Sequence, residues 1–542
     1  MPKVTGKCVN FVMCDTADNK GVIEIEEGQA RVCQECGSNL KMTQKTDGGK
    51  GKALTWAAGI VIVLVIAGLG LFYGLKSSPP PKPGPAKIKA DQGLDSAKTE
   101  KTAKTAPVDK LANVPPAQPG QIILKLHGSN TIGSKLGPAL AEQFLKNEGA
   151  RKIVKIPGQK EEEETIRGEF DDTAPAKLIE VHAHGSTTAF NDLFVNSCDI
   201  GMASRKIKDD EVKKLGEAGL GDMTSANSEH TLALDGIAVI VNRANPVKSL
   251  SVEQLRGIFS GEISDWAAVK GEPGKIRVCS RDNNSGTYDT FKSLVLHDKK
   301  LVATSERYED SNLLSDTVAG DPKAIGFIGL PYIKSAQALE IIEPGASPIL
   351  PSFFTVARED YPLSRRLFLY TPESPKNPWI HKFIDFALSK EGQDIVKQVG
   401  FIDQTIKAEK IEKKVADTPE SLDKYGQLTK NLNQLSTNFR FKASSDKFDN
   451  RAIRDLDRVV QVLTQPAYKG KDFYLLGFTD NKGDDQFNIA LSRSRAMSVA
   501  NELKKRGADA KRVEGFGPSN PVASNETKEG RDKNRRVEIW IN

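Results

Sequence analysis

The sequence predicts a multi-domain α/β protein joined to one transmembrane helix, and three observations support this fold class. A chain of 542 residues is too long for a single hydrophobic core, so about two to four domains are expected. From residue 121 onward, short apolar runs alternate with amphipathic stretches, which is typical of strands alternating with helices. Residues 53–75 form one apolar segment without a charged residue, as a membrane-spanning helix requires.

Four cysteines precede the apolar segment and predict a small metal-binding module over residues 1–45. They follow the pattern C-x5-C-x18-C-x2-C, and two short pairs of thiolates suit a tetrahedral zinc site. Two disulfides or four free thiols are the alternatives. A module below about 40 residues has almost no core, so a metal is the expected source of its stability. We therefore expect a zinc-ribbon-like module whose zinc ligands are Cys8, Cys14, Cys33 and Cys36.

Residues 53–75 are expected to cross a bilayer as one helix. At about 1.5 Å per residue this helix spans roughly 35 Å, enough to cross the hydrocarbon core with some tilt. It lacks the polar face that a soluble core helix shows, and it begins too deep in the chain for a signal peptide. Gly70 and Gly74 form a G-x-x-x-G step that could pair two such helices in a homodimer.

The remaining segments divide into two linkers and two α/β domains. Residues 76–120 are rich in Pro, Lys, Ala and Thr and are predicted to form a disordered linker. A larger α/β domain is expected at 121–405 and a smaller one at 431–542, with a charged linker at 406–430 between them. Lysines flank the apolar segment on both sides, so the positive-inside rule leaves its orientation open. Reduced, metal-binding thiols favour a cytoplasmic N-terminus.

The charge balance argues against nucleic acid as a partner. Lys and Arg number 77 and Asp and Glu 71, which gives a net charge of +6. This small excess is spread along the chain, and no basic patch interleaved with aromatic residues is present.

Two isolated features are expected to be structural. Cys198 and Cys279 stand apart and are predicted to be buried free thiols, with a disulfide between them as the alternative. His182 and His184 form an H-x-H pair. The sequence shows no second cluster that would complete a metal site.

Three turns in the larger domain predict an oxyanion site. HGSNTIG at 127–133, HGSTTAF at 184–190 and RDNNSGTYDTF at 281–291 each follow an apolar segment. Each would place hydroxyls and backbone N–H groups at the start of a helix, where the helix dipole favours an anion. Arg205 and Arg281 can add bidentate donors.

These residues resemble the substrate-binding proteins of bacterial phosphate ABC transporters, the PstS-like family with the type 2 periplasmic binding fold. The matching stretches are GSNTIG, GSTTAF, DIGMASRKIKDDE, LALDGIAVIVN, SVEQLRGIFSGEISDW, RDNNSGTYDTF and AIGFIGLPYI. The resemblance implies two lobes joined by crossovers near Asp235–Val241 and Ala324–Pro331, with the anion held between the lobes. It also implies that the following residues face the anion: Ser129, Asn130, Thr131, Ser186, Thr187, Arg281, Ser285, Gly286 and Thr287.

The chain departs from the family pattern at two positions that bear on anion selectivity. Arg205 stands where the best-known members carry an Asp that accepts the proton of hydrogen phosphate, and Asn283 replaces a second acidic residue. Asp235 is the remaining candidate acceptor, with a hinge role bonding to backbone as its alternative. Phosphate is therefore the expected ligand, with sulfate or a phosphoester left open.

The C-terminal domain pairs a carboxylate with a guanidinium. Asp480 follows an apolar run and Arg495 lies in the next helix-like run, at 488–506, after an earlier one at 450–464. Such a pair can hold a zwitterion, although an ordinary salt bridge is the simpler interpretation.

The surrounding motifs resemble the OmpA-like peptidoglycan-binding domain. They are G-F-T-D-N-x-G at 477–483, N-x-x-L-S-x-x-R-A-x-x-V at 488–499, G-F-G-x-x-N-P-V at 515–522 and N-R-R-V-E at 534–538. The resemblance implies that Asp480 and Arg495 bind the diaminopimelate of the peptide stem. It also implies that the pocket is shaped by Thr479, Asn488, Leu491 and Arg536.

Together these features predict a single-pass protein of the bacterial inner membrane with a cytoplasmic N-terminus and periplasmic C-terminal domains. It would bind phosphate or a similar oxyanion, be tethered to peptidoglycan, and serve in phosphate capture or sensing. A structural envelope tether with a degenerate anion site is the alternative. No H-E-x-x-H or G-x-S-x-G motif is present, so an enzyme is not expected, and residues 53–75 lack the acidic residue that a proton-conducting stator needs.

Overall fold

The computed structural model has two compact units, Met1–Ala117 and Gln118–Asn542. It describes residues 3–8, 22–26, 40–42, 120–160, 162–171, 174–283, 285–411, 424–441 and 447–542. The predicted transmembrane segment 53–75 and the predicted linker up to residue 119 lie outside these residues, as do Cys14, Cys33 and Cys36. Within the described ranges no helix is both long and apolar enough to cross a membrane.

The first unit contains a small antiparallel sheet in the order β2-β1-β3. Its strands are β1 (Lys3–Cys8), β2 (Val22–Glu26) and β3 (Leu40–Met42). Cys8 is the last residue of β1 and pairs with Leu40. The zinc site remains a prediction.

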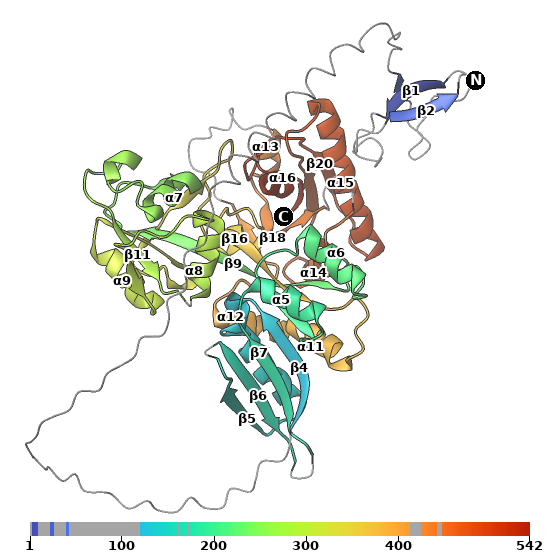
Figure 1. Ribbon diagram of the computed structural model, residues 1–542. Helices are drawn as coiled ribbons and strands as arrows, with labels where there is room; N and C mark the ends of the chain where they lie inside the picture. Colours follow the sequence, from blue (N-terminus) through green and yellow to red (C-terminus); the bar gives the residue numbers. More distant parts are fainter. Residues whose placement is uncertain are drawn as a thin grey trace, which may run out of the picture. The chain divides into compact units, whose positions relative to one another are not determined.

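The first lobe of the second unit is a sheet with helices packed on it (Figure 1). Its core joins Leu124 and Leu126 of β4 to Leu140 and Phe144 of α4 and Phe383 of α11. This lobe contains β4 (Gln121–Gly128), α3 (Asn130–Gly133), α4 (Leu136–Asn147), β5 (Lys152–Pro157), β6 (Glu163–Glu169), β7 (Lys177–His182), α5 (Ser186–Phe194), β8 (Ile200–Ala203), α6 (Asp209–Glu217), β16 (Ser364–Tyr370), α11 (Pro378–Leu388) and α12 (Lys390–Val399).

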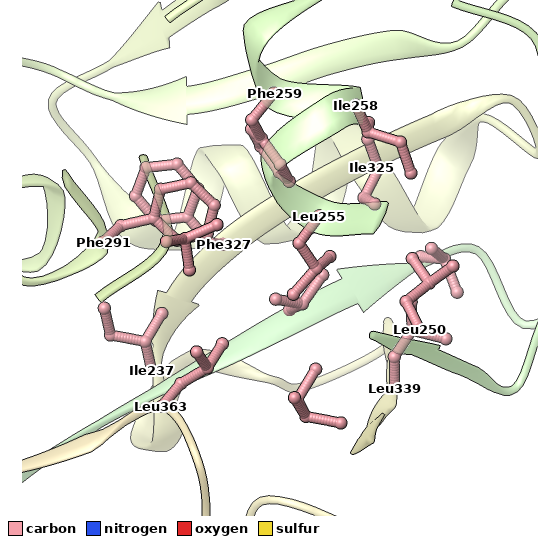
Figure 2. Close-up of a cluster of buried hydrophobic side chains, with 14 of the residues drawn as sticks. Ile237, Leu250, Leu255, Ile258, Phe259, Phe291, Ile325, Phe327, Leu339 and Leu363 are labelled. Atoms are coloured by element: carbon pink, nitrogen blue, oxygen red, sulfur yellow. The ribbon is translucent and has the colours of Figure 1, made fainter. Parts of the chain in front are cut away.

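The second lobe has its own core, shown in Figure 2. Phe291 and Phe327 stack with centroids 3.9 Å apart, and Phe259 meets both rings edge-on. These rings belong to a core cluster that is distinct from the core of the first lobe. It contains β10 (Ser249–Ser251), α7 (Val252–Ser260), η1 (Trp266–Val269), β11 (Arg277–Arg281), α8 (Gly286–Phe291), η2 (Lys292–Leu296), β12 (Glu306–Tyr308), α9 (Ser311–Gly320), β13 (Ala324–Gly329), η3 (Leu330–Tyr332), β14 (Gln337–Ala338), β15 (Glu340–Ile342) and α10 (Phe353–Ala357).

One long strand, β9 (Glu229–Val241), connects the lobes and is buried along its whole length. Its first part pairs with β16 and its last part with β13, so the predicted crossover near Asp235–Val241 is confirmed. The predicted second crossover near Ala324–Pro331 is wrong. Those residues begin with β13, which pairs with β9 and β11 inside the second lobe, and the chain returns through β16. An apolar run predicts a buried strand but not the sheet that it joins.

The C-terminal domain is a five-stranded sheet in the order β17-β18-β21-β19-β20 with helices packed on it. The helix-like runs predicted at 450–464 and 488–506 are confirmed as α14 and α15. The stretch predicted as a linker at 406–430 contributes β17 and α13. The elements are β17 (Ala408–Lys410), α13 (Lys424–Thr429), β18 (Asn433–Arg440), α14 (Asn450–Leu463), β19 (Phe473–Gly477), α15 (Asp485–Lys505), β20 (Arg512–Gly515), α16 (Lys528–Asn534) and β21 (Arg536–Ile541).

Cys198 and Cys279 are buried and free, as predicted. Burial raises the pKa of both thiols, that of Cys279 to about 11. Both side chains therefore remain protonated and act as small apolar groups.

A buried ion network joins the lobe connection to the C-terminal domain. The Glu359 carboxylate accepts hydrogen bonds from Arg366 on β16, at 2.8 Å, and from Arg451 on α14. Arg440 on β18 lies 3.4 Å away. Burial raises the pKa of Glu359, but these arginines outweigh it and hold the pKa well below its usual range. The C-terminal domain is thus held by charges that water does not screen.

His230 on β9 also contacts the C-terminal domain and predicts a pH effect. Its Nδ1 lies 3.0 Å from a guanidinium nitrogen of Arg454, and its Nε2 lies 3.2 Å from the hydroxyl of Thr371. Burial lowers the pKa of His230 most, and the nearby charges of Arg454 and His381 lower it further. A hydrogen bond with the backbone of Asn227 raises the pKa, and the net result is a pKa of about 4. In the unfolded chain the imidazole takes a proton below about pH 6.5.

The unfolded state therefore binds this proton first as the pH falls. We expect the free energy of unfolding to decrease by about 3 kcal/mol between pH 6.5 and pH 4 because of His230 alone. Urea denaturation at pH 4.5 and 7.5 checks this, and His230→Gln should reduce the difference between the two pH values. His297→Asn, at an exposed position that does not contribute to the pKa of His230, should keep it. An unchanged difference in His230→Gln contradicts the prediction.

Candidate functional site

The first predicted turn joins β4 to α3. Gly128 has φ +138°, and a Cβ at this position would lie 2.1 Å from the backbone oxygen of Met202, so only glycine fits. Ser129 and Thr131 follow and are 1% and 3% exposed. The Ser129 hydroxyl is buried without a hydrogen-bond partner among the described residues. Such a group normally has a partner, so a ligand oxygen would complete it.

The other two turns lie against the first. The second turn is tied to it by a hydrogen bond from the Gly185 amide to the Gly128 oxygen, at 2.7 Å. The third turn meets it at Gly286, where a Cβ would lie 2.9 Å from the Cα of Thr131. The Thr131 hydroxyl also lies 3.3 Å from the Asp289 carboxylate. The three turns predicted from sequence are therefore brought together at the junction of the two lobes.

Arg365 on β16 projects into this junction and was not predicted. Its Nη2 donates to the hydroxyls of Thr131, at 2.8 Å, and Thr290. Its side chain is 8% exposed, and its Nε lies 3.5 Å from Asp235. The sequence contains a feature that could have indicated Arg365. Two adjacent arginines lie near the start of an apolar strand, and neighbouring strand residues face opposite sides, so one of the two must face inward. Arg365 faces the junction, and Arg366 faces the C-terminal domain.

Asp235 lies beside this guanidinium. It is the strand partner of Arg365, is 8% exposed, and accepts a 2.6 Å hydrogen bond from the Thr290 hydroxyl. A carboxylate, a guanidinium and several hydroxyls therefore meet in a nearly dry space. This set can donate hydrogen bonds to an oxyanion and accept a proton from it.

The two predicted arginines are engaged with protein groups. Arg205 makes a bidentate contact with Glu211, at 2.8 and 2.6 Å, and lies 3.4 Å from the Thr187 hydroxyl. Arg281 donates to the Ser311 hydroxyl and to the backbone oxygens of Tyr308 and Glu309. In this structure both arginines support the turns. Among the remaining predicted residues, the Ser186 hydroxyl lies 3.1 Å from the Ser204 hydroxyl. Asn130 begins α3, Ser285 occupies the N-cap position of α8 without a side-chain capping bond, and Thr287 lies in α8.

The C-terminal site is built around Asp480, which follows β19. Asp480 accepts hydrogen bonds from the Lys482 amide, at 3.0 Å, and from Arg535, at 2.6 Å. Arg535 was not predicted as a site residue. Arg495 lies on α15 with its guanidinium carbon 5.4 Å from the ring centre of Phe441. The Thr479 hydroxyl is buried and unbonded within the described part of the chain.

The other predicted pocket residues have structural contacts. The Asn488 amide donates to the Lys482 oxygen at 2.9 Å. Arg536 pairs with Glu538 at 2.7 Å and covers the ring of Phe478, and Leu491 is half-buried on α15. The Asp480 carboxylate is thus paired with the guanidinium of Arg535 in this structure.

Comparison with known proteins supports both domains. Residues 141–391 match the model of the PBP superfamily domain, and residues 440–535 match that of the OmpA family. The chain is 30% identical over 257 residues to Protein SphX of Synechococcus elongatus, which covers 45% of this chain and 74% of that protein. It is 30% identical over 240 residues to the Phosphate-binding protein PstS of Staphylococcus aureus, with 43% and 71% covered.

Among solved structures, an ABC-type phosphate transport receptor from Vibrio cholerae is 26% identical. The match covers 52% of this chain and 99% of that chain, with a TM-score of 0.39. The matched ranges agree with the resemblances expected from the sequence motifs, so the predicted type 2 periplasmic binding fold and OmpA-like domain are confirmed. The chain therefore belongs to the PBP superfamily, with a PstS-like domain joined to a C-terminal domain of the OmpA family.

Proposed function

We propose that this protein binds phosphate between the two lobes of its PstS-like domain and acts as a binding protein, not as an enzyme. The observation that supports this most directly is that Arg365 donates hydrogen bonds to the hydroxyls of Thr131 and Thr290. In the same turn as Thr131, the buried hydroxyl of Ser129 has no partner among the described residues. Hydroxyl and guanidinium donors in a dry space suit a phosphoryl group. Phosphate is also the ligand for which the staphylococcal relatives, the Phosphate-binding proteins PstS, are named.

Asp235 is the proposed proton acceptor. Hydrogen phosphate carries a proton that sulfate lacks, so a buried carboxylate bonds the first anion and repels the second. The strand pairing with Arg365 keeps Asp235 within the same site. Arg205 and Arg281 are proposed to position the turns, and the hydroxyls and amides of the three turns are proposed to contact the anion.

Titration calorimetry of the purified full-length protein with phosphate, sulfate and a phosphate monoester tests this function. Micromolar or tighter binding of phosphate, with no detectable sulfate binding, is expected. Sulfate binding as tight as phosphate binding would exclude Asp235 as the selective acceptor. Binding of none of the three anions, together with retained peptidoglycan binding, would favour a structural envelope tether.

The C-terminal domain is proposed to bind the diaminopimelate of peptidoglycan through Asp480 and Arg495. Removing a charged hydrogen-bonding group from such a site costs about 1.5–3 kcal/mol, which corresponds to roughly 10- to 100-fold in affinity. We therefore expect Asp480→Ala to lose cosedimentation with purified peptidoglycan sacculi. Asp509→Ala, at a surface ion pair where Asp509 is 73% exposed, should keep it. Equal sedimentation of the two variants would refute the assignment.

The placement in the cell follows as a further part of the proposal. Peptidoglycan binding puts the C-terminal domains in the periplasm, and the apolar segment 53–75 would anchor the chain in the inner membrane, with the option of pairing through Gly70 and Gly74. The four-cysteine module would then hold zinc in the cytoplasm. In this arrangement the protein captures or senses phosphate close to the membrane.

A further inference from the structure

A second polar cluster lies on the first lobe, on strands that lead into the anion-binding turns. Glu180 and His182 are alternate residues of β7 and therefore share a face. His127 on the parallel neighbour β4 is the register partner of His182. The sequence showed no further group that could complete a metal site with the H-x-H pair, and the neighbouring strand β4 supplies one in His127. One ligand atom from each of these three side chains lies within 4.8 Å of the other two.

His127 is oriented as a metal ligand. Its Nδ1 lies 2.8 Å from the carboxylate of Asp192 on α5. The ring is 5% exposed, and its Nε2 is buried with no hydrogen-bond partner in the described part of the chain. A carboxylate on one nitrogen fixes the tautomer and leaves the other nitrogen as the lone-pair donor, which is the usual support of a metal-bound histidine. A buried polar atom without a partner calls for an explanation, and a cation supplies one.

His182 faces the same space. Its ring stacks on that of His127 with centroids 4.1 Å apart and planes inclined by 16°. A second carboxylate supports the neighbouring histidine, because Glu163 lies 2.9 Å from the Nε2 of His184. Glu163 lies on β6 and is also the register partner of His182 on β7.

The third ligand, Glu180, has a competing partner among the described residues, Lys125. The Lys125 ammonium lies 3.7 Å from its carboxylate, but the lysine side chain is 40% exposed and can turn into water. Exposed ion pairs of this kind contribute little, so a divalent cation can displace the lysine.

We infer that His127, His182 and Glu180 form a binding site for a divalent transition metal of the zinc class. Two imidazoles and one carboxylate are a set that Zn²⁺ accepts, with a fourth position left for water or another ligand. Bonds of about 2.0–2.2 Å place neighbouring ligand atoms roughly 3.3 Å apart, so the side chains must close around the ion. The site is separate from the four cysteines of the first unit. His127 and Ser129 flank the end of β4, so the metal would place positive charge near the anion-binding turns.

Zinc titration of the full-length protein tests the inference. The predicted cysteine site would also bind zinc. The parent protein for this titration is therefore the full-length variant with Cys8→Ser, Cys14→Ser, Cys33→Ser and Cys36→Ser. These positions belong to the first unit, so the first lobe keeps its structure. Calorimetric titration of the metal-free parent with zinc chloride, in phosphate-free buffer, should give one equivalent with micromolar or tighter affinity. Absence of zinc binding to the parent overturns the inference.

Substitutions then locate the ion. His182→Gln and Glu180→Gln, at half-buried positions, should weaken zinc binding at least 10-fold, and His127→Gln should abolish it. Asp192→Asn should weaken it by about 10- to 100-fold without removing a ligand, because the carboxylate acts through His127. His381→Gln, at an exposed position, should bind like the parent. Circular dichroism checks folding, and unchanged affinity in folded His182→Gln and Glu180→Gln would refute the site even if His127→Gln does not fold.

Discussion

Glu359→Gln is expected to lower the free energy of unfolding of the second unit by about 3 kcal/mol, because it leaves buried arginines with one counter-charge fewer. Glu359 is the shared partner of Arg366, Arg440 and Arg451, whose side chains are 16%, 7% and 4% exposed. Each arginine keeps another carboxylate partner: Asp449 for Arg366, Asp360 for Arg440 and Asp455 for Arg451. The expected loss of stability therefore lies at the lower end of the range for breaking a buried ion pair. Glutamine has nearly the same shape, so the loss reports charge and not packing.

Urea unfolding at pH 7 measures this effect. Asp394→Asn is the matched control, because it removes a carboxylate from an ion pair with Lys390 in which the two side chains are 91% and 53% exposed. That control should change stability by less than about 0.5 kcal/mol. The low pKa of Glu359 keeps it ionised at neutral pH, and its contribution should fade below its unfolded pKa of about 4.3, as the pH falls toward the folded value. Similar losses in the two variants would contradict a buried network.

Arg365→Ala is expected to weaken phosphate binding at least about 100-fold, because a buried guanidinium makes charge-assisted hydrogen bonds to an oxyanion. Its side chain is 8% exposed and already orders the hydroxyls of Thr131 and Thr290 from the two lobes. Arg365→Lys should lose part of the affinity, since an ammonium keeps the charge but not the planar pair of donors.

Calorimetric titration with phosphate measures these affinities. Arg243→Ala removes an exposed arginine from the same domain and should bind phosphate like the unchanged protein. Circular dichroism separates loss of binding from loss of fold. Phosphate affinity that is the same in Arg365→Ala and Arg243→Ala would exclude Arg365 from the site and return the role of main cation to Arg281 or Arg205.

Much of the site was predictable because its residues lie in short contiguous motifs. Ser129 and Thr131 come from one turn and Ser285 and Gly286 from another, and each turn carries the glycine and hydroxyls that an anion site needs. Gly128 illustrates this, since its positive φ and close approach to Met202 admit only glycine. Asp480 was found in the same way, within a dense local motif at a strand end.

Arg365, Arg535 and His127 show what local motifs cannot indicate. Arg365 lies far along the chain from Thr131 and reaches it only because β16 pairs with β9 across both lobes. Arg535 meets Asp480 only when β21 pairs with β19. His127 joins His182 through the register of two parallel strands, and a shift of one residue would turn its ring to the other face.

The sequence by itself determined the two α/β domains, the three glycine- and hydroxyl-rich turns and the Asp480 motif, because hydrophobic period and turn chemistry are properties of neighbouring residues. Only the tertiary structure decided which charged groups meet. It set Arg365 against Asp235, gathered three arginines around Glu359, and stacked His127 on His182. The physical reason is that burial and strand register bring distant residues within a few ångströms, where charge and hydrogen bonding act strongly.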